Sequence, residues 1–225
     1  MKILIVSATK FEVFPLTKRL TKVSGKDNLW TYRSGRHSLD VLITGVGMTA
    51  TAFYLGKNLG KKYDLAINAG VAGSFRKNIQ PGTVVNVVSD RFADLGAEDG
   101  GRFLTLKQLG LGEIVHGSKF KVQSLKKGHR LSVIAQLPKV KSITVNTVHG
   151  NTASIKKVIK KFSPDVESME GAAFFYACNY EKIPCIQIRT ISNYVERRSK
   201  KKWKTNLAVK NLNVFLECFL KEYLH

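Results

Sequence analysis

Residues 65–74 read LAINAGVAGS, an apolar run that gives way to small residues. The run Leu65–Asn68 has the length and composition of a buried strand, and Gly70–Ser74 predicts a tight turn that lets the backbone approach a ligand closely. Similar Ile- and Val-rich runs recur along the chain, at residues 3–6, 41–44, 83–88, 142–146 and 185–190. Together they predict the buried strands of one sheet.

Helical patterns lie between several of these runs, at residues 11–20, 49–59, 152–161, 169–180 and 203–220. Alternation of strands and helices is typical of an α/β fold, so the sequence predicts one domain over residues 1–225 with helices covering the sheet. Pro81-Gly82 indicates a turn before the run at 83–88. Residues 90–112 are Gly-rich and show no clean period, which predicts a long loop.

The charge balance is strongly basic. Thirty-seven Lys and Arg face sixteen Asp and Glu, a formal net charge of +21. Such a charge favours nucleic acid as a partner, but the basic residues are spread over the whole chain and the densest run, Arg197–Lys202, has only Trp203 as an aromatic neighbour. We therefore expect no dedicated nucleic-acid role, and the charge either favours anionic substrates or reflects lysine-rich usage.

Two further classes of protein are disfavoured. No apolar stretch approaches the roughly 20 residues of a membrane span, and Met1 leads directly into a strand pattern without a secretory signal, so we expect a cytoplasmic protein with no membrane partner.

Cys178, Cys185 and Cys218 lack metal-ligand or CxxC spacing. We expect all three cysteines to be buried free thiols, and we expect no metal or organic cofactor.

Polar residues at the ends of the predicted strands are the candidates for chemistry, because ligands of open α/β sheets bind there. Glu12 begins the first helix, Gly45–Met48 opens the second, Glu170 precedes an apolar helix, and Asn193 follows the last strand. The glycine stretches fit neither a dinucleotide nor a triphosphate motif. Taken singly, Glu12 is typical of a helix start and Asn193 of a turn.

The motifs taken in order resemble the nucleoside phosphorylase/hydrolase superfamily from end to end. The resemblance is carried by Ala8 with Glu12, by Gly45-Val46-Gly47, by residues 68–73, by Met169-Glu170 and by residues 189–193. Residues 90–98, 169–175 and 191–196 further resemble the futalosine hydrolases of the menaquinone pathway. The resemblance implies a mixed, twisted central sheet flanked by helices. It also implies an N-ribosyl hydrolase without cofactor that releases hypoxanthine, and a homodimer or larger homo-oligomer.

The same resemblance implies roles for individual residues. Glu170 would bind the ribose hydroxyls, Met169 would line the sugar and base, and Glu12 with Arg189 would hold the attacking water, with Glu12 as general base. Asn193 stands where related nucleosidases carry the aspartic acid that protonates the base. The remaining substrate contacts implied by the resemblance are Ala8, Val46, Val71, Ala72, Gly73, Ser192 and Val195.

Several alternatives stay open at this point. An amide at 193 favours a 6-oxopurine but also pairs with adenine, so nucleosidases acting on aminofutalosine, methylthioadenosine or adenosylhomocysteine are the nearest alternatives. Ala8-Thr9 departs from the Gly and Arg pattern of phosphorylases, although Lys10 keeps a purine nucleoside phosphorylase in view. A non-catalytic ligand- or nucleic-acid-binding protein is the alternative of another class. The substrate's carboxyphenyl group would seek a cation, and Arg102, His149 and Arg198 are unranked candidates.

Overall fold

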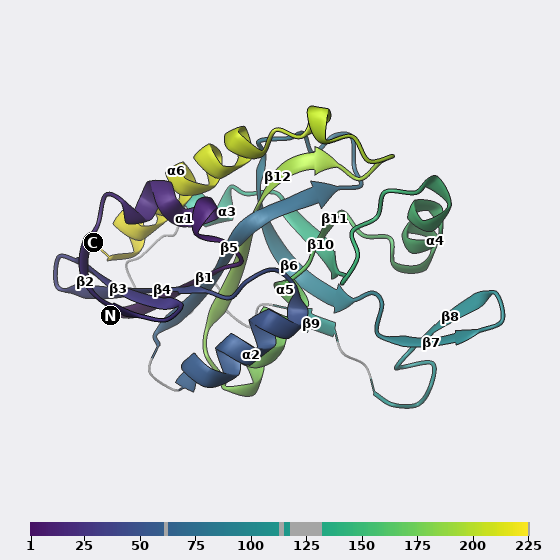
Figure 1. The fold of residues 1–225 in the computed structure, drawn as a ribbon, viewed down its shortest axis with the longest axis horizontal. Coiled ribbons are helices and arrows are strands. Elements are labelled where there is room, and N and C mark those ends of the chain that lie inside the picture. Colours follow the sequence, from purple (N-terminus) through teal and green to yellow (C-terminus); the bar gives the residue numbers. More distant parts are fainter. Residues whose placement is uncertain (61–62, 113–114, 118–131, 225) are drawn as a thin grey trace.

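The computed structural model describes residues 1–60, 63–112, 115–117 and 132–224. A ten-stranded sheet runs through the molecule in the order β11-β10-β6-β12-β5-β1-β4-β3-β2, with β9 paired to β6 (Figure 1). Its strands are β1 (Lys2–Ser7), β2 (Thr21–Lys26), β3 (Leu29–Ser34), β4 (His37–Ile43), β5 (Leu65–Ser74), β6 (Val84–Phe92), β9 (Val115–Gly117), β10 (Lys139–Thr144), β11 (Val166–Ser168) and β12 (Cys185–Tyr194).

The sheet is mixed, as the resemblance implied. β1 lies parallel to β4 and β5, and β5 lies parallel to β12, whereas β12 and β6 are antiparallel. The central strands β1 and β5 are buried on both faces, which explains their nearly continuous apolar runs. The parallel strands β1, β5 and β12 end at one edge, where the candidate residues collect.

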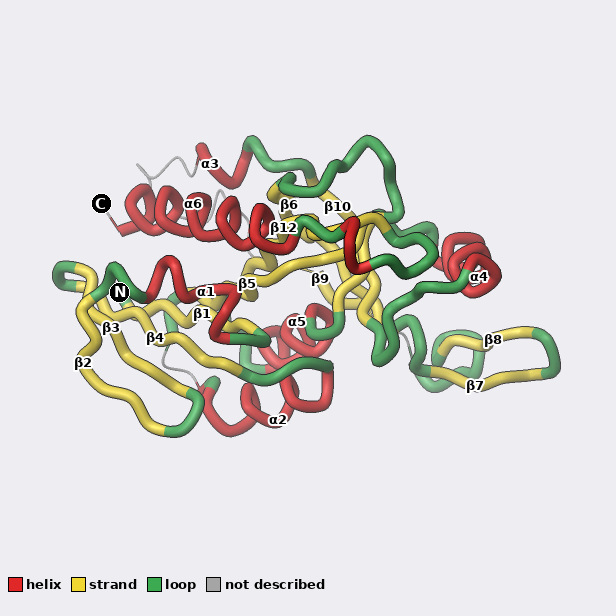
Figure 2. Tube along the Cα trace, turned by 45° about the horizontal axis from the view of Figure 1, so that its top comes forward, coloured by secondary structure: helices red, strands yellow, loops and turns green. Residues whose placement is uncertain are grey.

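Helices cover both faces of the sheet (Figures 1 and 2). On one face α1 (Lys10–Thr17) packs with α6 (Thr205–Leu224), and on the other α2 (Met48–Asn58) packs with α5 (Gly171–Tyr180). The short α3 (Ser132–Ala135) contacts α6, while α4 (Thr152–Phe162) lies near the far end of the sheet. The predicted α/β class and its five longer helices are therefore confirmed, with ends shifted by a few residues.

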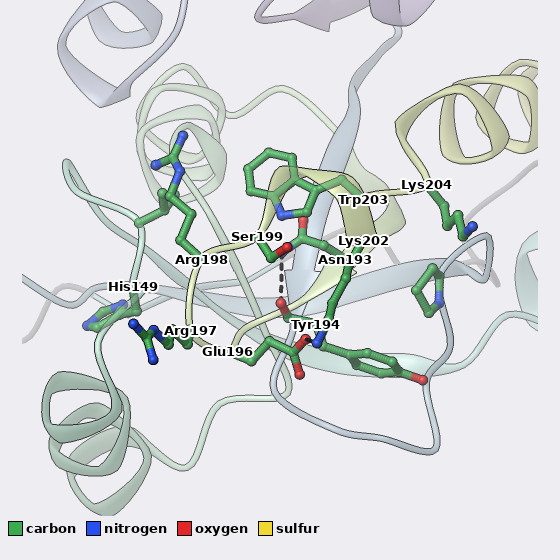
Figure 3. A pocket seen from close by; sticks show the side chains of 12 residues that line it. His149, Asn193, Tyr194, Glu196, Arg197, Arg198, Ser199, Lys202, Trp203 and Lys204 are labelled. Atoms are coloured by element: carbon green, nitrogen blue, oxygen red, sulfur yellow. Dashed lines mark hydrogen bonds and ion pairs between the residues drawn. The ribbon is translucent and has the colours of Figure 1, made fainter.

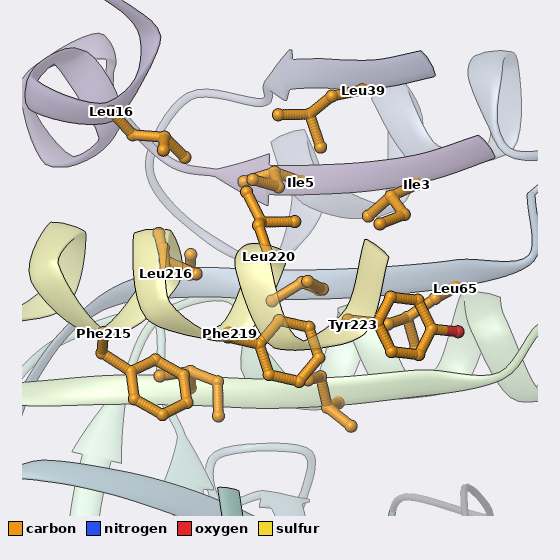
Figure 4. Close-up of a cluster of buried hydrophobic side chains, with 14 of the residues drawn as sticks. Ile3, Ile5, Leu16, Leu39, Leu65, Phe215, Leu216, Phe219, Leu220 and Tyr223 are labelled. Atoms are coloured by element: carbon orange, nitrogen blue, oxygen red, sulfur yellow. The ribbon is translucent and has the colours of Figure 1, made fainter. Parts of the chain in front are cut away.

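Helix α6 is held by an apolar stripe that faces the sheet. Leu212, Leu216 and Phe219 are fully buried against Ile3, Ile5 and neighbouring strand residues (Figure 4). The rings of Phe215, Phe219 and Tyr223 stack in sequence along it, because residues four apart share one helix face. This packing holds the C-terminal helix against β12, β5 and β6 on one face of the sheet.

Two predictions about non-regular structure are wrong. Gly70–Ser74 is not a turn, because β5 continues through it, with Gly70 opposite Arg189 and Ser74 opposite Tyr194 of β12. Residues 90–112 are not one long loop either, since β6 extends to Phe92 and a hairpin of β7 (Gly96–Asp99) and β8 (Arg102–Thr105) follows. The hairpin projects from the body of the molecule (Figures 1 and 2). The Pro81-Gly82 turn is confirmed, with Gly82 at φ +95°.

Strands β2 and β3 were not predicted. All six residues of β2 are exposed, so it lacks the apolar alternation that identifies a half-buried strand. It pairs at the sheet edge with β3, which pairs in turn with β4. None of the helices in the described part of the chain is long and apolar enough to cross a membrane.

Candidate active site

Glu12 is buried at the start of α1 and receives hydrogen bonds on both carboxylate oxygens. Oε2 accepts from the backbone N and Oγ1 of Thr9, both at 2.9 Å, and from Ser7 Oγ at 3.1 Å. Oε1 accepts from Val71 N at 3.1 Å. The bonds with Thr9 form a capping box, so Glu12 is a helix-start residue. Its other oxygen faces β5, where it accepts from Val71 N.

Arg189 is a fully buried cation in the middle of the sheet, with 1 % of its surface exposed. Its Nη2 donates to Asn68 Oδ1 at 2.5 Å, and its Nη1 lies 3.4 Å from Glu170 Oε2. Asn68 is itself fixed by donating to the Val6 carbonyl at 3.1 Å. The guanidinium therefore has a carboxylate on one side and a fixed amide on the other, an arrangement that offsets the cost of burying its charge.

Gly70 provides the space in which these side chains meet. A Cβ at Gly70 would lie 2.9 Å from Glu12 Oε1 and would collide with Nη1 of Arg189. Gly70 lies directly opposite Arg189 in the β5–β12 ladder, so the guanidinium passes over it. Glu12 of α1 and Arg189 of β12 thus approach each other across one residue without a side chain.

Glu170 caps the start of α5 and completes the cluster. It is buried, and Oε1 accepts from Gly47 N at 3.2 Å, which ties it to the loop before α2. Burial raises the pKa of Glu170 above its ordinary value, while the charge of Arg189 and the Gly47 hydrogen bond act in the opposite direction. The negative charge of Glu12 raises this pKa further. Two carboxylates and one guanidinium therefore share a small buried volume.

A third buried carboxylate, Asp90 of β6, fixes the start of α5. It accepts from Thr144 Oγ1 at 2.9 Å and from Gln187 Nε2 at 3.0 Å, while Thr144 Oγ1 accepts from Ala172 N at 2.8 Å. Burial raises the pKa of Asp90 to about 6, although these hydrogen bonds favour its charged form. The sequence pattern placed Asp90 in a loop, so its role in positioning Glu170 was missed.

Asn193 lies near the end of β12, at an irregularity in the ladder. Ile191 pairs with Ala72 and Asn193 with the next residue, Gly73, so Ser192 is an extra residue. Asn193 Oδ1 accepts from Ser192 Oγ at 2.7 Å, and Nδ2 donates to the Tyr194 carbonyl at 2.9 Å. A Cβ at Gly73 would lie 3.4 Å from Asn193 Nδ2. The amide is therefore part of a strand, and the turn interpretation is wrong.

A cavity of about 350 Å³ opens beside Asn193 (Figure 3). Its wall is mainly formed by the segment that joins β12 to α6, and it carries four cationic side chains and one acidic one. The residues that line it are Pro81, Val148, His149, Asn193, Tyr194, Glu196, Arg197, Arg198, Ser199, Lys202, Trp203 and Lys204.

The three candidates for binding the carboxyphenyl group do not lie together in the structure. His149 and Arg198 line this cavity, whereas Arg102 lies exposed on the β7–β8 hairpin. Lys10, which kept phosphorolysis in view, holds its ammonium 4.6 Å from the centre of the Trp30 ring. The structure thus places two of the three tail candidates beside Asn193.

The remaining predicted residues lie on β5, on β12 and on the loops beside them. Ala8 and Ser192 are buried and Met169 is half-buried, while the side chain of Val46 is 58 % exposed. The carbonyl of Ala8 accepts from Gly45 N at 3.0 Å, joining the first two loops. Val71, Ala72 and Gly73 continue β5. Val195 Cγ2 lies 2.9 Å from the position that a Cβ of Gly73 would take.

The cysteine prediction is partly wrong. Cys178 and Cys185 are buried free thiols, and burial raises the pKa of Cys178, but Cys218 is exposed on α6. The α6 pattern is apolar around Cys218, yet the residue lies on the outer side of the helix. In the described ranges, no group of three His, Cys, Asp or Glu residues is arranged to hold a metal ion.

Comparison with known proteins shows the family of the chain. The family model of the phosphorylase superfamily matches residues 2–221. Futalosine hydrolase of Streptomyces coelicolor is 29 % identical over 181 residues, 76 % of this chain and 73 % of that protein. The 5′-methylthioadenosine/S-adenosylhomocysteine nucleosidase of Buchnera aphidicola is 26 % identical over 220 residues, 92 % of this chain and 84 % of that one.

A solved structure shows the same fold over the full length. Futalosine hydrolase of Helicobacter pylori superposes with a TM-score of 0.83 at 15 % identity, covering 99 % of this chain and 98 % of that one. The mixed sheet and its flanking helices are thus shared from end to end. By the match over residues 2–221, the chain belongs to the phosphorylase superfamily.

Proposed function

We propose that this protein is a futalosine hydrolase, an N-ribosyl hydrolase that releases hypoxanthine from futalosine in menaquinone biosynthesis. The observation that carries the proposal is the buried cluster of Glu12, Arg189 and Glu170 beside an amide, Asn193, at a sheet edge. Relatives named futalosine hydrolase in Streptomyces coelicolor and Thermus thermophilus, each 29 % identical, support the choice of substrate.

The cluster supplies what cleavage of an N-glycosidic bond requires. The bond between ribose C1′ and the base nitrogen breaks, its electron pair leaves with the base, and positive charge grows on the ribose. Glu170, buried beside Gly47 N, binds the ribose hydroxyls and stabilises that charge. Glu12 and Arg189 hold the water that attacks C1′, and Glu12 accepts its proton.

The charges of the cluster favour water over phosphate as the nucleophile. A phosphate next to Glu12 and Glu170 would meet two buried carboxylates, and the one buried guanidinium already contacts Glu170 and Asn68. The N–H and O–H groups of Thr9 are committed to Glu12, and Lys10 lies over Trp30. Donors that would hold a phosphate are thus already engaged.

Asn193→Ala tests the contact with the base. We expect turnover of futalosine to fall about 100-fold, because one preorganised donor to the leaving group is worth roughly that much in an enclosed site. The fold should persist, since Asn193 bonds only its own neighbours, Ser192 and Tyr194. Chromatographic rates and thermal melting check both points. Asn58→Ala on α2 is the matched control, and equal rates in the two variants would remove Asn193 from the mechanism.

Arg198→Ala tests the contact with the carboxyphenyl group of the substrate. We propose that Arg198, exposed on the cavity wall, pairs with this carboxylate, so the variant should raise KM for futalosine about 10-fold. KM for inosine, which lacks the carboxylate, should stay unchanged. Arg102→Ala on the distant hairpin is the control. A rise in KM for both nucleosides would contradict the assignment.

We also propose that residues 1–225 act as one domain, assembled as a homodimer or larger homo-oligomer, with no dedicated nucleic-acid partner. Two exposed apolar residues of α1, Phe11 and Phe14, support a subunit contact. Light scattering measures the assembly, and any affinity for nucleic acid should vanish at moderate salt.

The deciding experiment is chromatographic detection of free base from futalosine, aminofutalosine, methylthioadenosine and inosine, each with and without phosphate. Phosphate-independent release of hypoxanthine from futalosine alone is the expected result. Adenine from methylthioadenosine would instead favour a nucleosidase like the Buchnera relative. Release of no base from any of them would overturn the proposed enzyme and favour a binding protein.

A further inference from the structure

A buried carboxylate holds a histidine at the wall of the cavity beside Asn193. Glu167 Oε2 lies 2.7 Å from His149 Nδ1, and Glu167 Oε1 accepts from His149 N at 3.1 Å. The side chains are 4 % and 16 % exposed. Because both oxygens of the Glu167 carboxylate accept hydrogen bonds from His149, the orientation of the imidazole is fixed, with a proton on Nδ1. Among the described residues, Nε2 has no hydrogen-bond partner.

The pair lies next to the amide that faces the base. The position of a Gly73 Cβ is 3.4 Å from Asn193 Nδ2 and 3.6 Å from Glu167 Cγ, so both side chains flank the same glycine. His149 and Asn193 line one cavity, as Figure 3 shows. The ring of Phe75 packs against His149 with its centre 6.4 Å away. The imidazole is thus held by its neighbours at the edge of the proposed base site.

Asn193 leaves one chemical requirement unmet. Its amide can donate hydrogen bonds, but it cannot transfer a proton to a departing base. A base that leaves with the electron pair of the C1′–N bond gains negative charge, which an acid can neutralise as the bond breaks. A carboxylate-bound imidazole is a common proton donor of this kind, because its charged form is stabilised by the carboxylate.

We propose that His149, positioned by Glu167, donates the proton to the leaving base. This inference rests on the proposed nucleoside hydrolysis. The electron pair of the glycosidic bond goes to the base, the Nε2 proton of His149 goes to N7 of the base, and water adds to C1′ while Glu12 takes its proton. One water is consumed, and the free base and the ribose hydroxyl are formed. Solvent in the open cavity returns the proton from Glu12 to His149.

The test compares leaving groups that do and do not need a proton. Futalosine and 4-nitrophenyl β-ribofuranoside are hydrolysed by the wild-type protein, His149→Gln and Glu167→Gln, with His37→Gln as a matched control on β4. We expect His149→Gln to lose about 100-fold or more on futalosine, the range of general acid catalysis, and less than about threefold on the nitrophenyl riboside. Glu167→Gln should show the same selectivity with a smaller loss, because glutamine still accepts from Nδ1.

The pH profile is a second readout. The pH profiles of futalosine turnover by the wild-type protein and by His149→Gln should differ in shape, because only the wild-type protein carries the imidazole that donates the proton. The other titratable or charged groups that face His149 are Glu167 on β11 and, across the cavity, Tyr194, Glu196, Arg197, Arg198, Lys202 and Lys204. Their own titrations remain in the variant, which isolates the contribution of His149.

Four outcomes overturn the assignment. Equal losses on both substrates mean that His149 supports the site without donating a proton, and unchanged rates on both mean that it does neither. A wild-type protein that releases no base overturns the proposed function and this inference together, whereas a normal wild-type rate with unselective variants overturns the inference alone. Should the nitrophenyl riboside be refused by the wild-type protein, an unaltered pH profile in His149→Gln overturns it.

Discussion

Glu12→Gln is expected to turn over futalosine about 10²- to 10⁴-fold more slowly than the wild-type protein, the factor that a positioned general base contributes. An amide cannot take the proton of the attacking water. It also turns an NH₂ group toward either Thr9 N or Val71 N, which now donate to the carboxylate. Loss of one of these two hydrogen bonds should lower the free energy of unfolding by only about 1 kcal/mol, so the variant stays folded.

Initial rates of hypoxanthine release measure this loss, and circular dichroism melting verifies the fold. Glu98→Gln, on the exposed β7–β8 hairpin, removes the same charge far from the cluster and should be indistinguishable from wild type. Turnover of Glu12→Gln within threefold of that control would show that Glu12 serves only to begin α1.

Arg189→Met is expected to cost about 3–5 kcal/mol of unfolding free energy, because removing one partner of a buried ion pair leaves the other charge uncompensated. Glu170 would lose its cation, and Asn68 Oδ1 would lose its donor at 2.5 Å. Urea denaturation measures the change. Activity should fall below detection, since Arg189 belongs to the proposed water site and also pairs with Glu170 of the proposed ribose site.

The same variant has a pH dependence with a definite sign. The pKa of Glu170 is already raised by burial, and removal of Arg189 takes away the main influence that lowers it. A native state that binds a proton more tightly than the unfolded chain is stabilised as pH falls. The destabilisation should therefore be larger at pH 8 than at pH 5. Arg76→Met breaks an exposed pair with Asp165 at 2.8 Å and should cost less than about 1 kcal/mol at either pH.

The elements with strong apolar runs could be predicted from the sequence. β1, the first half of β5 and the five longer helices were found because burial on one or both faces leaves a readable pattern. The same reasoning located Glu12, Glu170 and Asn193, since each lies near the end of a strand or at the start of a helix. The structure pairs Glu170 with Arg189 and places Glu12 and Arg189 on either side of Gly70, while the catalytic roles of these three residues and of Asn193 remain predictions.

The rest depended on contacts between distant segments. Gly70–Ser74 has the composition of a turn, and only pairing with β12 holds it extended. β2 has no buried face, so no periodicity marks it. Glu167 and His149 are 18 residues apart and form their pair through the fold of β11 beside β5. Asp90 lies in an extension of β6 that paired strands impose, where local composition indicated a loop.

Gly70 has a consequence for how this protein can change over evolutionary time. A side chain at position 70 would occupy the space in which Glu12 and Arg189 meet, so neither partner tolerates it in its present place. Substitution at 70 therefore becomes acceptable only after the cluster around it has been dismantled. A lineage that has lost the cluster and then Gly70 cannot recover the site by one mutation. Restoring Glu12 or Arg189 while residue 70 carries a side chain would force the charged group against that side chain.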